Sequence, residues 1–116
     1  MLPPLTSRGR LRVNRRIEIV TQTIPKLYET ESVPLEKKIV CQRYQIKEIG
    51  FYWLIVELNC EENLAFGYAN LDNDDLAEWG DIHIGELLDN GAVLDREWMP
   101  CSFADALKKI AKEKSE

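Results

Sequence analysis

The middle of the chain holds three segments, joined by short polar stretches, whose apolar residues are typical of β-strands. Residues 51–58 are the most apolar, and their aromatic and β-branched side chains on both faces predict a central strand covered from two sides. Residues 39–46 precede this strand, and residues 64–70, where large apolar residues alternate with small ones, follow it. Because the polar connections are short, we expect the three strands to pair antiparallel.

Helical patterns lie mainly in the last third of the chain. Ser102 and Asp105 have the spacing of a capping box, and the residues that follow combine an apolar stripe with lysines suited to the last turns of a helix. That stripe consists of Phe103, Ala106, Leu107 and Ile110. A shorter helix is expected over 84–89, ended by a left-handed Gly91, and a strand is expected over 93–98.

Together these elements predict an α+β fold in a single domain over 14–116. The domain is expected to be a mainly antiparallel sheet with the C-terminal helix packed on it and one or two short additional helices. Asn14 is expected to cap one of these helices, although Ile19, which lies off the helical stripe, keeps a strand open as the alternative. The core residues expected to be buried together are Trp53, Ile55, Phe66 and Leu107.

The composition is that of one folded domain: 116 residues, of which 45% are apolar and 30% charged. The longest unbroken apolar run, 51–56, is much shorter than the roughly 20 residues that span a membrane. The N-terminus has arginines but no apolar stretch, so it does not match a secretory signal. Three widely spaced cysteines favour a reducing compartment, and we therefore expect a cytoplasmic protein.

Charge is divided unevenly along the chain. Residues 1–16 hold five arginines and no acid, whereas the remainder holds 10 basic and 20 acidic residues and has a net charge of −10. Because residues 1–13 also contain two prolines and a glycine, we expect them to form a basic flexible leader. The leader is interpreted either as an electrostatic arm for nucleic acid or an acidic partner, or as an extension without function. The acidic domain itself is not expected to bind nucleic acid directly.

Residue types that carry enzyme chemistry are scarce. The three cysteines and the single histidine lack the spacing of a zinc site, and no nucleophile motif or phosphate-binding loop is present, so no cofactor is expected. An acidic segment offers carboxylates for Ca²⁺ or Mg²⁺, but no EF-hand register fits it, and a solvated loop is the simpler interpretation. The weak metal candidates in this segment are Asp72, Asp74, Asp75 and Glu78.

Trp79, beside the acidic segment, is the leading candidate for an interaction surface, because exposed aromatic residues anchor interfaces. Asp81 and His83 complete the candidate surface, and His83 would add sensitivity to pH near neutrality. The competing interpretation places Trp79 in the core and leaves the acids merely solvated. For His83, the N-cap of the short helix, with Glu86 at the third position, is favoured over a catalytic pair with a cysteine or serine.

Five stretches, in this order and spacing, resemble the bacterial family known as "domain of unknown function 2958". They are IPKLYETE at 24–31, FYW at 51–53, FGY at 66–68, WGDIHIGEL at 79–87 and LDREW at 94–98. The resemblance implies a compact α+β domain typical of plasmids and other mobile elements, and it implies no activity or catalytic residue. His83 stands where that family commonly has serine, which suits a helix cap.

The leading expectation is a non-enzymatic cytoplasmic binding or accessory protein of a bacterial mobile element, with a protein as one candidate partner and no membrane association. Two alternatives stay open. One is an acidic mimic or inhibitor of a nucleic-acid-binding protein, motivated by the charge of −10. The other is a small carboxylate- or metal-dependent enzyme that uses the acidic segment.

A chain that begins at Asn14 tests the leader. This truncation changes the net charge from −5 to −8, and we expect it to unfold in urea as cooperatively as the full chain, because the leader contributes few apolar residues to a core. Tryptophan fluorescence follows the transition. A broad, non-cooperative transition in the shortened chain would contradict the division at residue 13.

Overall fold

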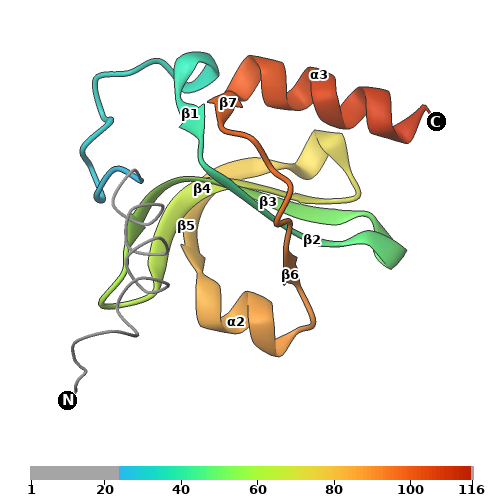
Figure 1. Cartoon of the computed structure of the whole chain (residues 1–116), viewed down its shortest axis with the longest axis horizontal. Coiled ribbons are helices and arrows are strands. Elements are labelled where there is room, and N and C mark those ends of the chain that lie inside the picture. The colour runs from blue at the N-terminus through green and yellow to red at the C-terminus, as the bar shows by residue number, and fades with distance from the viewer. Residues whose placement is uncertain (1–23, 116) are drawn as a thin grey trace, which may run out of the picture.

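The computed structural model describes residues 24–115, so the expected leader and the expected helix after Asn14 lie outside the described residues. Five strands form an antiparallel sheet in the order β5-β4-β3-β2-β6 (Figure 1). They are β2 (Gln42–Ile46), β3 (Phe51–Asn59), β4 (Leu64–Leu71), β5 (Glu78–His83) and β6 (Val93–Leu94). The α+β fold with a mainly antiparallel sheet is therefore confirmed.

A second, two-stranded sheet and several helices complete the described fold. The small sheet pairs β1 (Ile39–Val40) with β7 (Cys101–Ser102). The α-helices are α2 (Ile84–Asp89) and the C-terminal α3 (Phe103–Lys114). Single 3-10 turns are η1 (Leu35–Lys37), η2 (Lys47–Ile49) and η3 (Asp74–Leu76).

The central strand β3 is covered on both faces, as its sequence predicted. Figure 1 shows α3 on one side of the sheet and α2 on the other. Tyr52, Leu54 and Val56 pack with residues of α3, whereas Trp53 and Ile55 pack with residues of α2. The prediction of one shared core was wrong in this respect. Phe66 and Leu107 adjoin the α3 side, and the alternation of β3 sends Trp53 and Ile55 to the opposite side.

Both predicted helices begin where their sequences indicated, and α2 also ends where expected. The Ser102 hydroxyl accepts a hydrogen bond from the N–H of Asp105 at 3.2 Å and so caps α3. His83 occupies the N-cap position of α2, although its side chain makes no capping hydrogen bond. Gly91 follows α2 with a φ of 92°, a left-handed conformation that glycine adopts without strain.

Three strand assignments differ from the sequence prediction. The segment 39–46 divides at Cys41, because its first part pairs with β7 and its second with β3. The strand expected over 93–98 ends at Leu94, where Asp95 accepts a hydrogen bond from the N–H of Glu97 at 3.0 Å and turns the chain. The strand β5 was missed, because no strand was expected between the acidic segment and the helix over 84–89.

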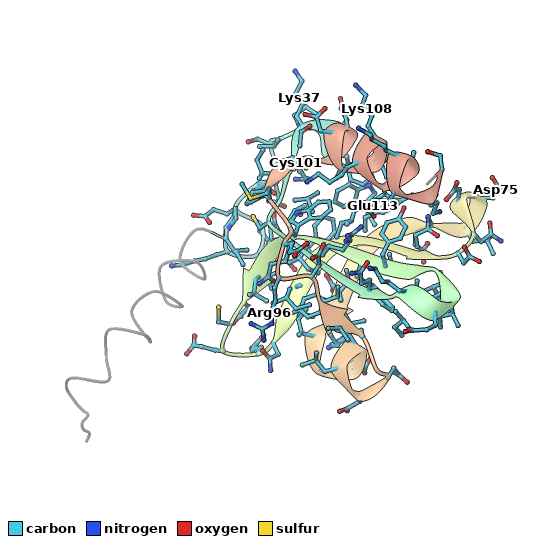
Figure 2. All side chains as sticks on the ribbon, turned by 45° about the vertical axis from the view of Figure 1, so that its right-hand side comes forward. Lys37, Asp75, Arg96, Cys101, Lys108 and Glu113 are labelled. Atoms are coloured by element: carbon cyan, nitrogen blue, oxygen red, sulfur yellow. The ribbon has the colours of Figure 1, made fainter. Side chains whose placement is uncertain are left out.

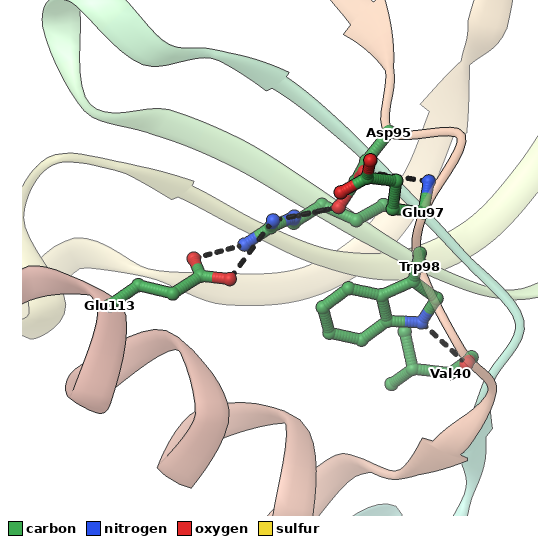
Figure 3. Close-up of polar contacts among 6 residues, drawn as sticks. Val40, Asp95, Glu97, Trp98 and Glu113 are labelled. Carbon is green, nitrogen blue, oxygen red and sulfur yellow. Dashed lines mark hydrogen bonds and ion pairs between the residues drawn. The ribbon is translucent and has the colours of Figure 1, made fainter.

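Arg43, buried on β2, connects this strand to the C-terminal part of the chain. Figure 3 shows its partners Asp95 and Glu113 together with Trp98. Its guanidinium donates to Asp95 Oδ2 at 2.7 Å and to Glu113 Oε1 at 2.7 Å. It also lies 5.0 Å from the centre of the Trp98 ring, and Trp98 Nε1 donates to the carbonyl oxygen of Val40 at 3.0 Å. Because a buried guanidinium requires compensating charge, this network fixes the chain after β6 and the end of α3 against β2.

The strands β3 and β4 approach closely at Gly67. A Cβ atom at this position would lie 1.9 Å from the carbonyl oxygen of Leu54, so no side chain fits without moving one of the two strands. Gly80, its cross-strand partner on β5, has nothing within 4 Å of the corresponding position.

Gly67→Ala and Gly80→Ala form a matched test of this close approach. We expect Gly67→Ala to lower the free energy of unfolding by more than about 2 kcal/mol, because the added methyl group overpacks a buried backbone contact. We expect Gly80→Ala to change it by less than about 1 kcal/mol. Urea denaturation of both variants measures the difference, and equal stabilities would contradict the close packing of β3 and β4.

Candidate functional site

A β-bulge in β3 directs a charged residue toward the α3 side of the sheet. Ile55 pairs with Gly67, but Glu57 pairs with the next residue back, Phe66, so Val56 is an extra residue in β3. Strict alternation would place Glu57 on the α2 side with Ile55. After the bulge it lies instead beside Phe66, which packs against the core of the α3 side.

The Glu57 carboxylate, 3% exposed, holds the segment that precedes the sheet. Its Oε1 accepts the N–H of Tyr28 at 2.8 Å, and its Oε2 accepts the N–H of Thr30 at 3.0 Å together with the Thr30 hydroxyl. Lys38, also buried, donates from Nζ to the carbonyl oxygen of Thr30 and to its hydroxyl oxygen. These bonds fix residues 28–38 over one end of the sheet.

The environment of Glu57 favours its charged form. Burial acts to raise the pKa of this carboxyl, but the hydrogen bonds from Thr30 and Tyr28 and the nearby positive charge of Lys38 outweigh burial and lower the pKa. Glu57 is therefore a carboxylate at neutral pH. Since its oxygens already accept three hydrogen bonds, it serves to position the chain.

Tyr28 is held in an unusual conformation at this site. Its φ is 69°, in the left-handed region that non-glycine residues seldom occupy, and its side chain is 72% exposed. The hydrogen bond from its N–H to Glu57 supports this conformation. Backbone strain of this kind concentrates at sites that bind or react, and a large exposed aromatic ring is a typical anchor for a partner.

A pocket of about 460 Å³ lies between this segment and the sheet, within the range of small-ligand and side-chain sites. Its apolar walls are Leu27, Tyr28, Val33, Pro34, Leu35 and Phe66. Its charged lining residues are Glu31, Lys38, Glu57 and Asp81. We call it the Phe66 pocket. It can receive an apolar or aromatic group and surround it with carboxylates.

The three predicted interaction residues share one strand. Trp79, Asp81 and His83 alternate along β5, so they project from the same face of the sheet. Asp81 is exposed and lines the Phe66 pocket. His83 is exposed at the start of α2.

Trp79 is half-buried, so it is neither the fully exposed interface residue nor the core residue that the two interpretations of the sequence expected. Its ring stacks on Phe66 with centroids 5.7 Å apart and approaches Phe103 of α3 at 4.7 Å. The indole therefore supports the floor of the Phe66 pocket and contacts the core.

The acidic segment lies at the other end of the β4–β5 hairpin from Asp81, and Figure 2 shows Asp75 at its outer edge. Asn70, fully buried, organises this loop by donating to Asp74 Oδ1 at 2.8 Å and accepting the N–H of Asn73 at 3.0 Å. Within residues 24–115, no three His, Cys, Asp or Glu side chains are placed to hold a metal ion. The geometry thus does not assemble Asp72, Asp74, Asp75 and Glu78 into a cation site.

The residues that build the pocket were not singled out from the sequence, although the sequence holds one signal for them. Glu57 is the single charged residue in the apolar run 51–58, and a charge in a doubly covered strand requires partners. Its partners, Tyr28 and Thr30, lie more than 25 residues away and have no periodic pattern. Over the described part of the chain, no helix is long and apolar enough to cross a bilayer.

The pH dependence of stability tests the role of Glu57. Its pKa is lower in the folded than in the unfolded chain, so its stabilisation is present above about pH 4.3, the ordinary pKa of glutamate, and is lost as the pH falls through the lower folded pKa. We expect Glu57→Gln to lower the free energy of unfolding at pH 7 by about 1–3 kcal/mol. We also expect the free energy of unfolding of this variant to fall less steeply as the pH is lowered.

The control is Glu78→Gln, at an exposed position of β5. Urea denaturation between about pH 3 and pH 7 compares both variants with the unaltered protein. Equal pH profiles for all three proteins would show that Glu57 does not hold the segment in solution.

Comparison with known proteins gives no match: no family model, curated protein or solved structure is similar to the chain. The resemblance to the "domain of unknown function 2958" family therefore stays a prediction from the five sequence stretches.

Proposed function

We propose that the protein is a non-enzymatic, cytoplasmic binding protein that takes a group of a partner protein into the Phe66 pocket. The observation that carries this proposal is the pocket itself: about 460 Å³, with apolar walls and an exposed tyrosine at its edge. The family resemblance would place such a protein among the accessory proteins of bacterial mobile elements.

The lining of the pocket supports binding better than catalysis. None of its described lining residues is a serine, cysteine or histidine. Glu57 and Lys38 are capable of proton transfer, but each is engaged in hydrogen bonds with the segment 28–30. Glu31 and Asp81 are exposed carboxylates, whose simplest use is to attract and orient a charged group.

Two leucine variants of the full chain test this function. Leu35 is 44% exposed in the pocket wall, and Leu88 is 53% exposed on α2, outside the pocket. We expect Leu35→Lys to abolish capture of those proteins that both the unaltered protein and Leu88→Lys retain from the source cytoplasm, because a long, positively charged side chain in the wall opposes insertion of an apolar group and of a cation alike. Capture of the same proteins in equal amounts by all three chains would overturn the proposal.

A further inference from the structure

We infer that the group received by the Phe66 pocket is an arginine side chain from a basic segment of the partner protein. This inference rests on the proposed function and specifies the chemistry of the partner. It follows from the charges of the pocket, from its aromatic surface and from their relative positions.

The pocket is lined by more negative than positive side chains. Glu31 and Asp81 are exposed at its edge, and neither forms an ion pair with another residue of the range 24–115. Lys38, the cation among the lining residues, is buried and donates to Thr30. Counting Glu57, three carboxylates face one ammonium group, so the pocket attracts a cation and repels a phosphate.

The aromatic surface lies directly beside a carboxylate. Phe66 and Asp81 are cross-strand partners in β4 and β5, a pairing that places their Cβ atoms about 5 Å apart. Trp79 is stacked on the Phe66 ring at an interplanar angle of 26°, which holds the ring in place while it lines the pocket. A group that covers Phe66 is therefore within reach of the Asp81 carboxylate.

Guanidinium is the cation that fits both features. It is planar and weakly hydrated, it stacks on aromatic rings, and its forked N–H groups pair with a carboxylate through two hydrogen bonds. Lysine has a compact and strongly hydrated ammonium group, which suits an apolar pocket less well. The three methylene groups of arginine would lie along the walls formed by Leu35 and Val33.

Calorimetric titration of the full chain with three matched peptides tests the inference. Each peptide is a short glycine-serine sequence with one central residue, which is arginine, lysine or citrulline. Citrulline keeps the shape and planarity of arginine and removes its charge. We expect the arginine peptide to bind about tenfold more tightly than the citrulline peptide, the factor that corresponds to one charge-assisted hydrogen-bonded pair, and also more tightly than the lysine peptide.

Two charge-matched variants locate the binding. Asp81→Asn removes the pocket carboxylate, and Asp75→Asn removes an exposed carboxylate of the acidic loop outside the pocket. We expect Asp81→Asn to lose the preference for arginine over citrulline and Asp75→Asn to keep it. Both substitutions are at exposed positions, and unchanged urea midpoints confirm that the variants are folded.

Equal affinities for arginine and citrulline, or equal losses in both variants, would overturn the inference, since binding would then depend on shape alone or on diffuse charge. The inference would also be overturned if none of the three peptides bound measurably. In each of these cases, the proposed function would still stand, with another ligand, if the Leu35 variant failed to capture the partner proteins that the unaltered protein captures. Equal capture by the unaltered protein and both leucine variants would overturn the proposed function itself.

Discussion

The buried carboxylate of Glu57 connects the sheet to the segment that precedes it through hydrogen bonds, and the Phe66 pocket depends on these bonds. A carboxylate at 3% exposure would be costly without partners, and the N–H groups of Tyr28 and Thr30 supply them. The bulge at Val56 is what aims Glu57 to this side of the sheet. Without the bulge, the residue would lie among the apolar side chains that pack on α2, and the segment 28–38 would lack its anchor.

Arg43 has the corresponding role for the C-terminal part of the chain. Like Glu57 it is a buried charge on a strand of the sheet, and like Glu57 it binds residues far away in the sequence, here Asp95 and Glu113. Burial acts to raise the pKa of Asp95, but its bonds with Arg43 and with the N–H of Glu97 lower it. The two charges thus fasten segments outside the five-stranded sheet to it, and the segment held by Glu57 supplies much of the wall of the Phe66 pocket.

Features encoded locally could be predicted from the sequence. The strand around 51–58 follows from its run of aromatic and β-branched residues, and the strand around 64–70 follows from its alternation of large and small residues. The start of α3 follows from the spacing of Ser102 and Asp105. β5 was missed because its two large apolar residues, Trp79 and Ile82, point to opposite faces and so show no alternation. Asp81 was singled out from the sequence as an interaction residue, but its placement beside Phe66 depends on strand pairing. The pocket depends on contacts between residues 27 to 29 positions apart in the sequence, for which no local pattern exists.

The pairing of β1 with β7 has a consequence for the order in which the chain assembles. Strands β2 to β5 are neighbours in sequence, so their hairpins close at a small entropic cost. The β1–β7 pair joins residues 39–40 to residues 101–102, and α3 follows directly after it. We therefore expect the hairpins to form first, with the Tyr52, Leu54 and Val56 face still open to water. Until α3 docks, this apolar face can associate with other chains. The rate of α3 docking therefore determines how much of the protein folds and how much aggregates.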